Sequence, residues 1–467
     1  MNVKDLIDYV DQHRSFLAHN AQALDIYEGN LGHYVVEIMR KTLSKSYFET
    51  IQDRIIPINV LTRLIEKMSK VYAYPVTRTS DTNQEFVDNI SKMTRLDQQM
   101  LLAEEFSFLF KGYALEPYID KATPQLRVIP YDRFIPLSED KKNPQKMTGM
   151  IKMMGKVEHQ GSECELFHYW TDEIFMAYTE KGIYDPDMYV DGKAIEGNPI
   201  GVIPFVYGNR SKSMLVPKAD SDMLQLTKMI PIVLSDLGGS VMYQCFTILF
   251  GIDVKTANLT MSPNAFWDIK SDPKSEKTPQ VGTIKPEADV NKVLDYVKNI
   301  FTLWLETKGL KVGNVGTMDG NNSASGISKI IDEMDTAEIR RASSQRLGEE
   351  EQDLWNLMAK MNNYWIESVP EYRAPKIDAD FFEVSIEYTQ PEPMLSRKEI
   401  FETTKAEYEA GFLTAEAAIE RMYPDLEGEA FEARVDNLRS LRVGREESNR
   451  QQQSETGSQG EQPLLSE

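Results

Sequence analysis

Apolar residues recur at helical spacing near the start of the chain. In residues 1–45, one helix face carries Leu6, Val10 and Leu17, and the pattern breaks at the Gly-Asn-Leu-Gly run of residues 29–32. Further helices with apolar residues at i, i+3 and i+4 are predicted over residues 57–72, 83–92 and 96–110. The N-terminal part of the chain is therefore predicted to be helical.

From residue 112 the apolar period changes to two. Turn residues separate the segments, as expected of an antiparallel meander over residues 112–206. Asp191-Gly192 suits the type I′ turn of a hairpin over residues 189–195. The other strands are predicted near residues 113–118, 126–130, 150–157, 163–170 and 173–178.

The pattern becomes helical again over residues 218–250. Four prolines then divide residues 251–289, in which short strand-like pieces occupy 266–269 and 281–284. A helix with one broad apolar face follows over about residues 288–309. An insertion of this length between two helices predicts a small folded module rather than a connector.

The C-terminal part alternates loops, helices and one strand. A polar, glycine-rich loop leads into a helix over residues 325–368, and Gly348 is its expected weak point. Residues 381–388 are predicted to form a strand. Gly411 as a helix end and Thr414 as an N-cap predict a helical hairpin. Its two helices cover residues 396–410 and 414–422.

Composition limits the chemistry of the protein. The 467 residues are 41% hydrophobic and 27% charged, which suits roughly two to four packed units. No apolar run is long enough to span a membrane, the first residues do not read as a signal peptide, and two distant cysteines suit a reducing compartment. The net charge of −21 argues against tight DNA binding, although it is compatible with guiding DNA through a channel.

Catalytic motifs are absent from the sequence. There is no P-loop, no HExxH and no GxSxG, and the five histidines show no ligand spacing. Asp187, Asp191 and Gly192 match three positions of a calcium loop, but the hairpin is the favoured interpretation. The enzymatic alternative is a metal-dependent nuclease that uses Asp185, Asp187 and Asp191. We predict no catalytic residue, metal or cofactor.

Five segments stand out by their order along the chain. They begin and end as INV…YAYP at 58–75, AEE…KGYA at 103–114, IPY…PL at 129–137, SASGI at 323–327 and KAEYEAGFLTAEAAIERMYP at 405–424. This order resembles the portal family of tailed double-stranded-DNA phages, especially the branch from long, flexible-tailed phages. The resemblance covers about residues 25–440 and rests on the order of parts rather than on fixed residues.

The resemblance implies an α+β subunit with a helical stem, a small mixed clip, an α/β wing with antiparallel strands, a long helix and a helical C-terminal crown. The implied parts are an N-terminal helical arm (1–45), the wing (46–217), a stem helix (218–250), the clip (251–289), a second stem helix (290–309), the tunnel loop (310–324), the long wing helix (325–368), a returning wing strand (369–395), the crown (396–443) and a disordered tail (444–467).

The family resemblance also implies a function and partners. Such subunits form a ring, usually of about twelve copies, at one capsid vertex. The ring nucleates procapsid assembly with scaffolding and major capsid proteins, docks the large terminase and later head-completion or tail proteins, and passes double-stranded DNA without reading its sequence. The protein is then expected in the virion after synthesis in the host cytoplasm, without a membrane partner. Another oligomeric virion component is the alternative.

The implied plan predicts two sets of site residues. An acidic wall lets DNA slide, while a few polar and cationic side chains near the tunnel loop keep it centred. These are Lys308, Lys311, Asn314, Asn321, Asn322 and Lys329. The clip is expected to dock partners through aromatic residues flanked by lysines. These are Phe266, Trp267, Lys270, Lys274 and Lys277.

Overall fold

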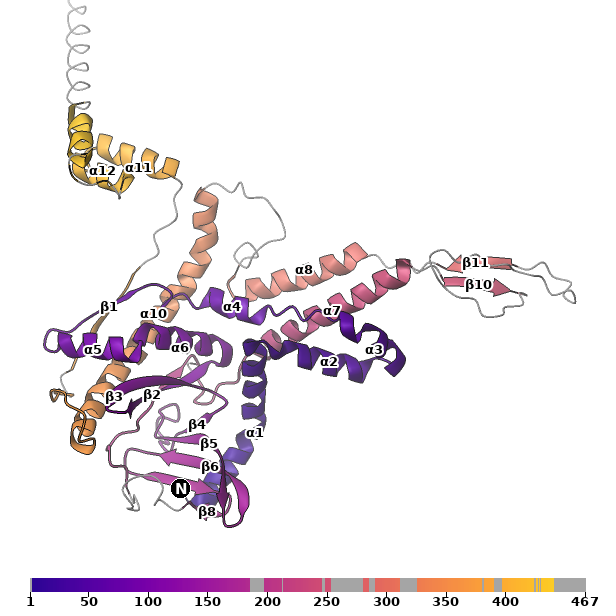
Figure 1. Cartoon of the computed structure of the whole chain (residues 1–467), viewed down its shortest axis with the longest axis horizontal. Helices are drawn as coiled ribbons and strands as arrows, with labels where there is room; N and C mark the ends of the chain where they lie inside the picture. The colour runs from indigo at the N-terminus through magenta and orange to yellow at the C-terminus, as the bar shows by residue number, and fades with distance from the viewer. Residues whose placement is uncertain are drawn as a thin grey trace, which may run out of the picture. The chain divides into compact units, whose positions relative to one another are not determined.

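Helices and antiparallel strands alternate along the chain in the computed structural model (Figure 1), which confirms the predicted α+β class. The chain divides into two compact units, Met1–Met318 with Glu333–Gln390 and Asp319–Asp332 with Pro391–Glu467. No helix in the described part is long and apolar enough to cross a membrane. The structure describes residues 2–184, 197–211, 213–245, 248–252, 280–284, 290–310, 326–379, 382–389, 397–423, 426, 428 and 430–440.

The first unit starts with a bent helical arm. Helix α1 (Val3–Asp25) passes through a π-helical turn (Ile26–Asn30) into α2 (Leu31–Thr42). The bend includes Gly29, whose φ of 112° is a conformation that only glycine adopts readily. The predicted break in the helical pattern is therefore confirmed. Helix α3 (Lys45–Ile51) and a short 3₁₀ turn (Gln52–Arg54) follow.

Helix α4 (Leu61–Met68) is shorter than the helix predicted over residues 57–72. Its start is fixed by Asn59, whose side chain accepts the Leu61 N–H at 3.0 Å. Beyond its end, the backbone N–H groups of residues 70–72 bond to the Glu104 carboxylate and do not continue the helix. Next come β1 (Val76–Thr79), α5 (Gln84–Thr94) and α6 (Leu96–Phe110), the last with its predicted bounds.

The strand region forms two antiparallel sheets rather than a single meander. In the first, β2 lies between β3 and β9, and in the second, β4 to β8 follow chain order. Strand β9 reaches β2 because Gly208 leaves room for the Tyr113 ring, which a Cβ there would approach to 2.3 Å. The strands are β2 (Gly112–Asp120), β3 (Thr123–Pro130), β4 (Phe134–Leu137), β5 (Gly149–His159), β6 (Ser162–Trp170), β7 (Phe175–Thr179), β8 (Gly182–Ile183) and β9 (Val206–Asn209). The predicted 189–195 hairpin lies outside the described residues.

Two helices and a strand pair follow the sheets. Helix α7 (Ser221–Cys245) precedes β10 (Ile248–Ile252), which pairs antiparallel with β11 (Gln280–Ile284), and α8 (Val290–Thr307) comes next. The predicted helix over residues 218–250 is therefore wrong at its end, because residues 248–250 pair as a strand with residues 282–284. The strand predicted over 281–284 is confirmed, and the one over 266–269 lies outside the described residues.

Helix α10 (Gly326–Ser368) is continuous through Gly348, the expected weak point of the predicted helix. After it, the chain returns as β12 (Ser385–Tyr388), which pairs antiparallel with β1. The predicted strand over residues 381–388 is thus confirmed only in its second half. Gly348 lies against the Tyr388 side chain, so this contact brings β12 close to the middle of α10.

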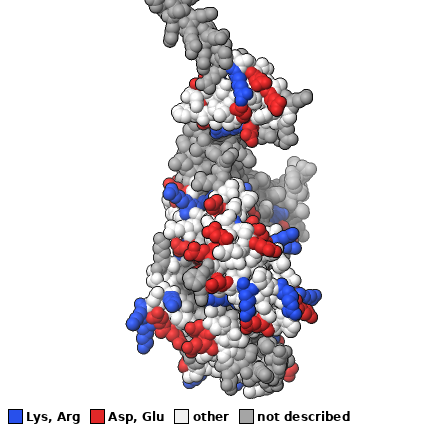
Figure 2. All heavy atoms as spheres, turned by 90° about the vertical axis from the view of Figure 1, so that its left-hand side faces the viewer, with Lys and Arg blue, Asp and Glu red and all other residues white. Residues whose placement is uncertain are grey.

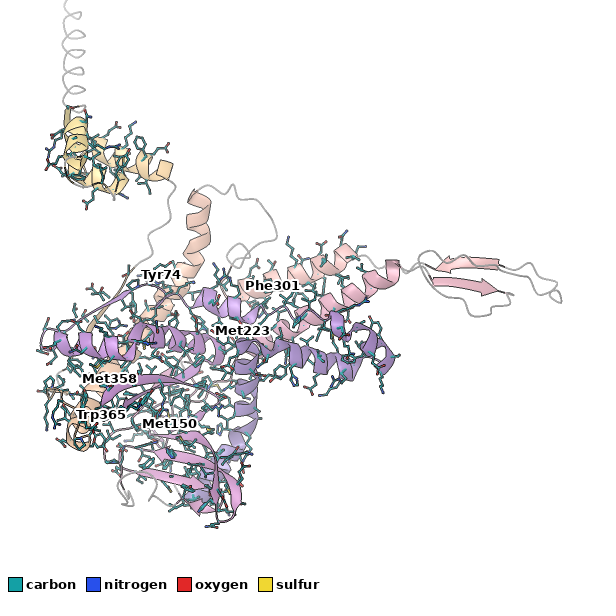
Figure 3. The ribbon with its side chains drawn as sticks, in the orientation of Figure 1. Tyr74, Met150, Met223, Phe301, Met358 and Trp365 are labelled. Carbon is teal, nitrogen blue, oxygen red and sulfur yellow. The ribbon has the colours of Figure 1, made fainter. Side chains whose placement is uncertain are left out.

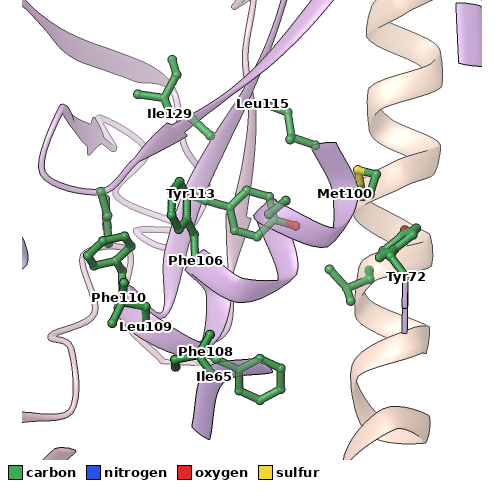
Figure 4. Packing of buried hydrophobic residues seen from close by; sticks show 14 of the residues in the cluster. Ile65, Tyr72, Met100, Phe106, Phe108, Leu109, Phe110, Tyr113, Leu115 and Ile129 are labelled. Atoms are coloured by element: carbon green, nitrogen blue, oxygen red, sulfur yellow. The ribbon is translucent and has the colours of Figure 1, made fainter. Parts of the chain in front are cut away.

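The core of the first unit gathers around α6 and the three-stranded sheet. Phe106, Phe110 and Tyr113 pack there (Figure 4), and α10 adds Trp355 and Met358, the latter labelled in Figure 3. Burying one large apolar side chain stabilises a fold by roughly 1.5–3 kcal/mol. A smaller cluster joins α1 to the five-stranded sheet through Leu6, Val10, Ile135, Ile151 and Tyr178.

The second unit contains the predicted helical hairpin, α11 (Arg397–Glu409) and α12 (Ala415–Met422). Gly411 has a φ of 82°, and the Thr414 hydroxyl accepts the Ala417 N–H at 3.3 Å. The predicted helix end and N-cap are both confirmed. The tail predicted to be disordered lies outside the described residues.

Candidate functional site

The helix pair α7–α8 precedes the segment for which the sequence predicts contact with DNA. The two helices run side by side (Figure 1). On α8, Trp304 and Leu305 are buried, whereas Leu294, Tyr296 and Leu303 are 43%, 55% and 64% exposed. Helix α8 therefore buries one apolar face inside the subunit and leaves further apolar side chains open.

An ion cluster joins the start of α7 to the end of α8. The Lys308 ammonium lies 2.9 Å from the Asp220 carboxylate and 3.1 Å from that of Asp222. Lys111, which follows α6, lies 2.5 Å from Asp220, and the Trp304 indole N–H donates to Asp222 at 2.9 Å. These contacts tie α6, α7 and α8 together at one point.

The two carboxylates of this cluster stay ionised. Burial raises the pKa of Asp220, but hydrogen bonds from Lys111 and Lys308 outweigh burial and lower it. The pKa of Asp222 is likewise lowered, since hydrogen bonds from Trp304 and Lys308 outweigh burial. Two ammonium groups therefore face two carboxylates, and the cluster is balanced in charge.

Of the predicted DNA-contact residues, Lys308 is the one whose side chain the structure describes. It is 18% exposed and belongs to the balanced cluster, so its positive charge is not free. Its contact with DNA stays a prediction. Lys329 lies on α10, but its side chain is outside the described part. The other predicted site residues also lie outside it: Lys311, Asn314, Asn321, Asn322, Phe266, Trp267, Lys270, Lys274 and Lys277.

The calcium-loop and nuclease alternatives depend on Asp185, Asp187 and Asp191, which lie outside the described residues. Asn198 occupies the position at which such a loop would place its bidentate glutamate, but its side-chain amide bonds to backbone carbonyls instead. Its amide donates to the carbonyls of Thr171 and Val202 at 2.8 and 2.7 Å. Across the described ranges, no group of three or more His, Cys, Asp or Glu side chains is placed to hold a metal ion.

The sequence-based prediction does not include a buried polar network that the structure shows on α10. Glu351 is fully buried and accepts hydrogen bonds from Arg78 at 2.5 Å and from the Tyr72 hydroxyl at 2.6 Å. The Trp355 indole N–H donates to the same carboxylate at 3.2 Å. Burying a charge is costly unless it is paired and hydrogen-bonded. These partners therefore fix α10 to β1 and to the segment after α4.

Glu350 anchors the same helix on another side. It accepts a 2.6 Å hydrogen bond from the Tyr113 hydroxyl and a 3.1 Å bond from the Asn209 backbone N–H. Arg346, one turn earlier, pairs with it at 2.7 Å. Helix α10 is thus held to both β2 and β9 by one carboxylate.

The sequence does contain a signal for these buried carboxylates. The buried stripe of α10 includes Leu347, Leu354 and Met358. Glu350 and Glu351 occupy the turn between them, where the helical period requires an apolar residue. Charged residues inside an apolar stripe indicate groups that are buried with partners.

A comparison with known protein families and one with curated proteins find no match to this sequence. The interpretation of function therefore rests on the residues and on the arrangement of elements.

Proposed function

We propose that this protein is the portal protein of a tailed double-stranded-DNA phage, a ring subunit through which the genome enters and leaves the capsid. The observation that supports it is the order of elements around the helix pair. Helices and two antiparallel sheets precede α7, the strand pair β10–β11 lies between α7 and α8 along the chain, and α10 returns to the first part of the unit. This is the order of wing, stem, clip, stem and long helix.

The exposed residues of α8 support the ring. Leu294, Tyr296 and Leu303 lie on one element and are open in the single chain. Tyr296 and Leu303 are seven residues apart and therefore share one face of α8, whereas Leu294 lies on the opposite side. An exposed apolar face is typical of subunit interfaces. In the proposed assembly, neighbouring stems cover these residues, the residues 251–289 dock the terminase and later head-completion proteins, and α11–α12 belong to the crown.

The channel hypothesis needs a revised set of contacts. In the proposed ring, Lys308 mainly links α8 to α7, because the carboxylates of Asp220 and Asp222 already neutralise its charge. Contact with the DNA backbone then falls to Lys311 and to the three asparagines of the predicted tunnel loop. An overall acidic ring keeps these contacts weak enough for DNA to slide.

Electron microscopy and mass photometry of the purified full-length chain test the proposal. We expect rings of about twelve subunits with a central hole, formed by the chain alone or after addition of its scaffolding protein. Monomers or dimers under both conditions would overturn the portal proposal.

A further inference from the structure

An open pocket of about 590 Å³ lies where the segment after β9 meets the start of α7 and the end of α8. It shares Lys111, Asp220 and Lys308 with the ion cluster. Two more cations, Arg210 and Lys218, also line it. The pocket therefore concentrates positive charge in a chain whose net charge is −21.

The charges of the pocket do not cancel. Lys111 and Lys308 are matched by the carboxylates of Asp220 and Asp222. Arg210 and Lys218, by contrast, make no ion pair with any residue that the structure describes. The pocket is therefore lined by two positive charges that no described carboxylate neutralises.

Arg210 is held in a defined position. Its guanidinium lies over the Phe108 ring, 4.3 Å from the ring centroid, and its backbone N–H donates to the Lys111 carbonyl at 2.9 Å. A guanidinium is planar, and its N–H donors lie around its edge in a fixed fork. That planar fork matches two oxygens of a phosphate or carboxylate.

We infer that this pocket binds a phosphate group. A phosphate monoester carries about −1.5 to −2 charges near neutral pH, which matches the two unpaired cations. Arg210 supplies the fork, Lys218 supplies a point charge, and Lys111 and Lys308 add donors that Asp220 holds in place. The chemistry is the same for free phosphate and for a nucleic-acid backbone, and the inference does not depend on the proposed function.

Calorimetric titration of inorganic phosphate into the full-length protein tests this site. We expect saturable binding, and an Arg210→Gln/Lys218→Gln variant should bind about tenfold or more weakly, because charge-assisted hydrogen bonds are lost. Both substitutions leave the Asp220 cluster intact. The matched control is Lys92→Gln/Lys146→Gln, which removes two exposed positive charges elsewhere and should leave binding unchanged.

The outcomes separate the possible sources of the phosphate. Competition between a short DNA duplex and inorganic phosphate at this site identifies a phosphodiester backbone. Competition by pyrophosphate but not by the duplex identifies a small phosphorylated molecule. Absence of saturable phosphate binding, or an equal loss in the control variant, would overturn the inference. If the double variant unfolds by circular dichroism, the two single variants give the same comparison.

Discussion

Glu104 is a buried carboxylic acid whose pKa is changed by its surroundings. Its side chain is fully buried, and its carboxylate accepts the N–H groups of Lys70, Val71 and Tyr72 at 2.9–3.2 Å. Burial raises the pKa of Glu104 from 4.5 to about 7, although these N–H groups act in the opposite direction. One carboxylate thus both ends α4 and carries a perturbed proton equilibrium.

This residue predicts a defined dependence of stability on pH. Between pH 4.5 and about 7, the native state holds the Glu104 proton more tightly than the unfolded state does. Its contribution is therefore present below pH 4.5 and is lost as pH rises through about 7, by at most about 3 kcal/mol. Glu104→Gln does not titrate, so the wild type should lose stability relative to this variant over that window. Denaturant unfolding of both proteins across the window measures it, and a constant difference would contradict the raised pKa.

In the ion cluster, the sequence singled out Lys308 as a functional candidate, but it did not predict the residues with which Lys308 pairs. Lys308 was predicted to contact DNA because the family resemblance places it where the second stem helix ends and the tunnel loop begins. Asp220 and Asp222 lie far from it in sequence, and Lys111 comes from a third element. Sequence spacing cannot reveal a cluster that packing of α6, α7 and α8 creates.

At the scale of elements, the bend between α1 and α2 gives a paired prediction. A Cβ at Gly29 meets nothing within 4 Å, so Gly29→Ala should destabilise only through its φ of 112°, by about 1–2 kcal/mol. Gly238 lies inside α7 and its Cβ would also be free of contacts. Gly238→Ala should stabilise by up to about 1 kcal/mol. Denaturant unfolding checks both, and a shift of the same sign would contradict the argument.

Long periodic segments were the most predictable elements. The bounds of α6 matched, and those of α10 differed by one residue, since many buried positions repeat at the helical period. Strand β10 was missed because its apolar run also continues a helix pattern, and only pairing with β11 decides between them. Strand β9 was missed as a partner of β2 for a similar reason. Non-local pairing is what the one-dimensional pattern lacks.

At the scale of the whole molecule, charge is plentiful but mixed. Lys and Arg lie among Asp and Glu over the face shown in Figure 2, so no single sign dominates there. The chain nevertheless carries −21, and a ring of about twelve copies would carry about −250. In the proposed ring, contacts such as the exposed apolar residues of α8 would have to offset this repulsion between subunits. We expect the ring fraction to rise with salt, because salt screens the repulsion.

The open side of α8 gives the last prediction, which rests on the proposed ring. Leu303 is 64% exposed in the single chain, and Ile183 on β8 is 63% exposed. Leu303→Glu should lower the ring fraction in mass photometry, because it adds a negative charge to a buried interface between acidic subunits. Ile183→Glu makes the same chemical change outside the helix pair and should assemble like the wild type. Equal assembly of both variants would mean that the exposed face of α8 is not the subunit interface, even if rings form.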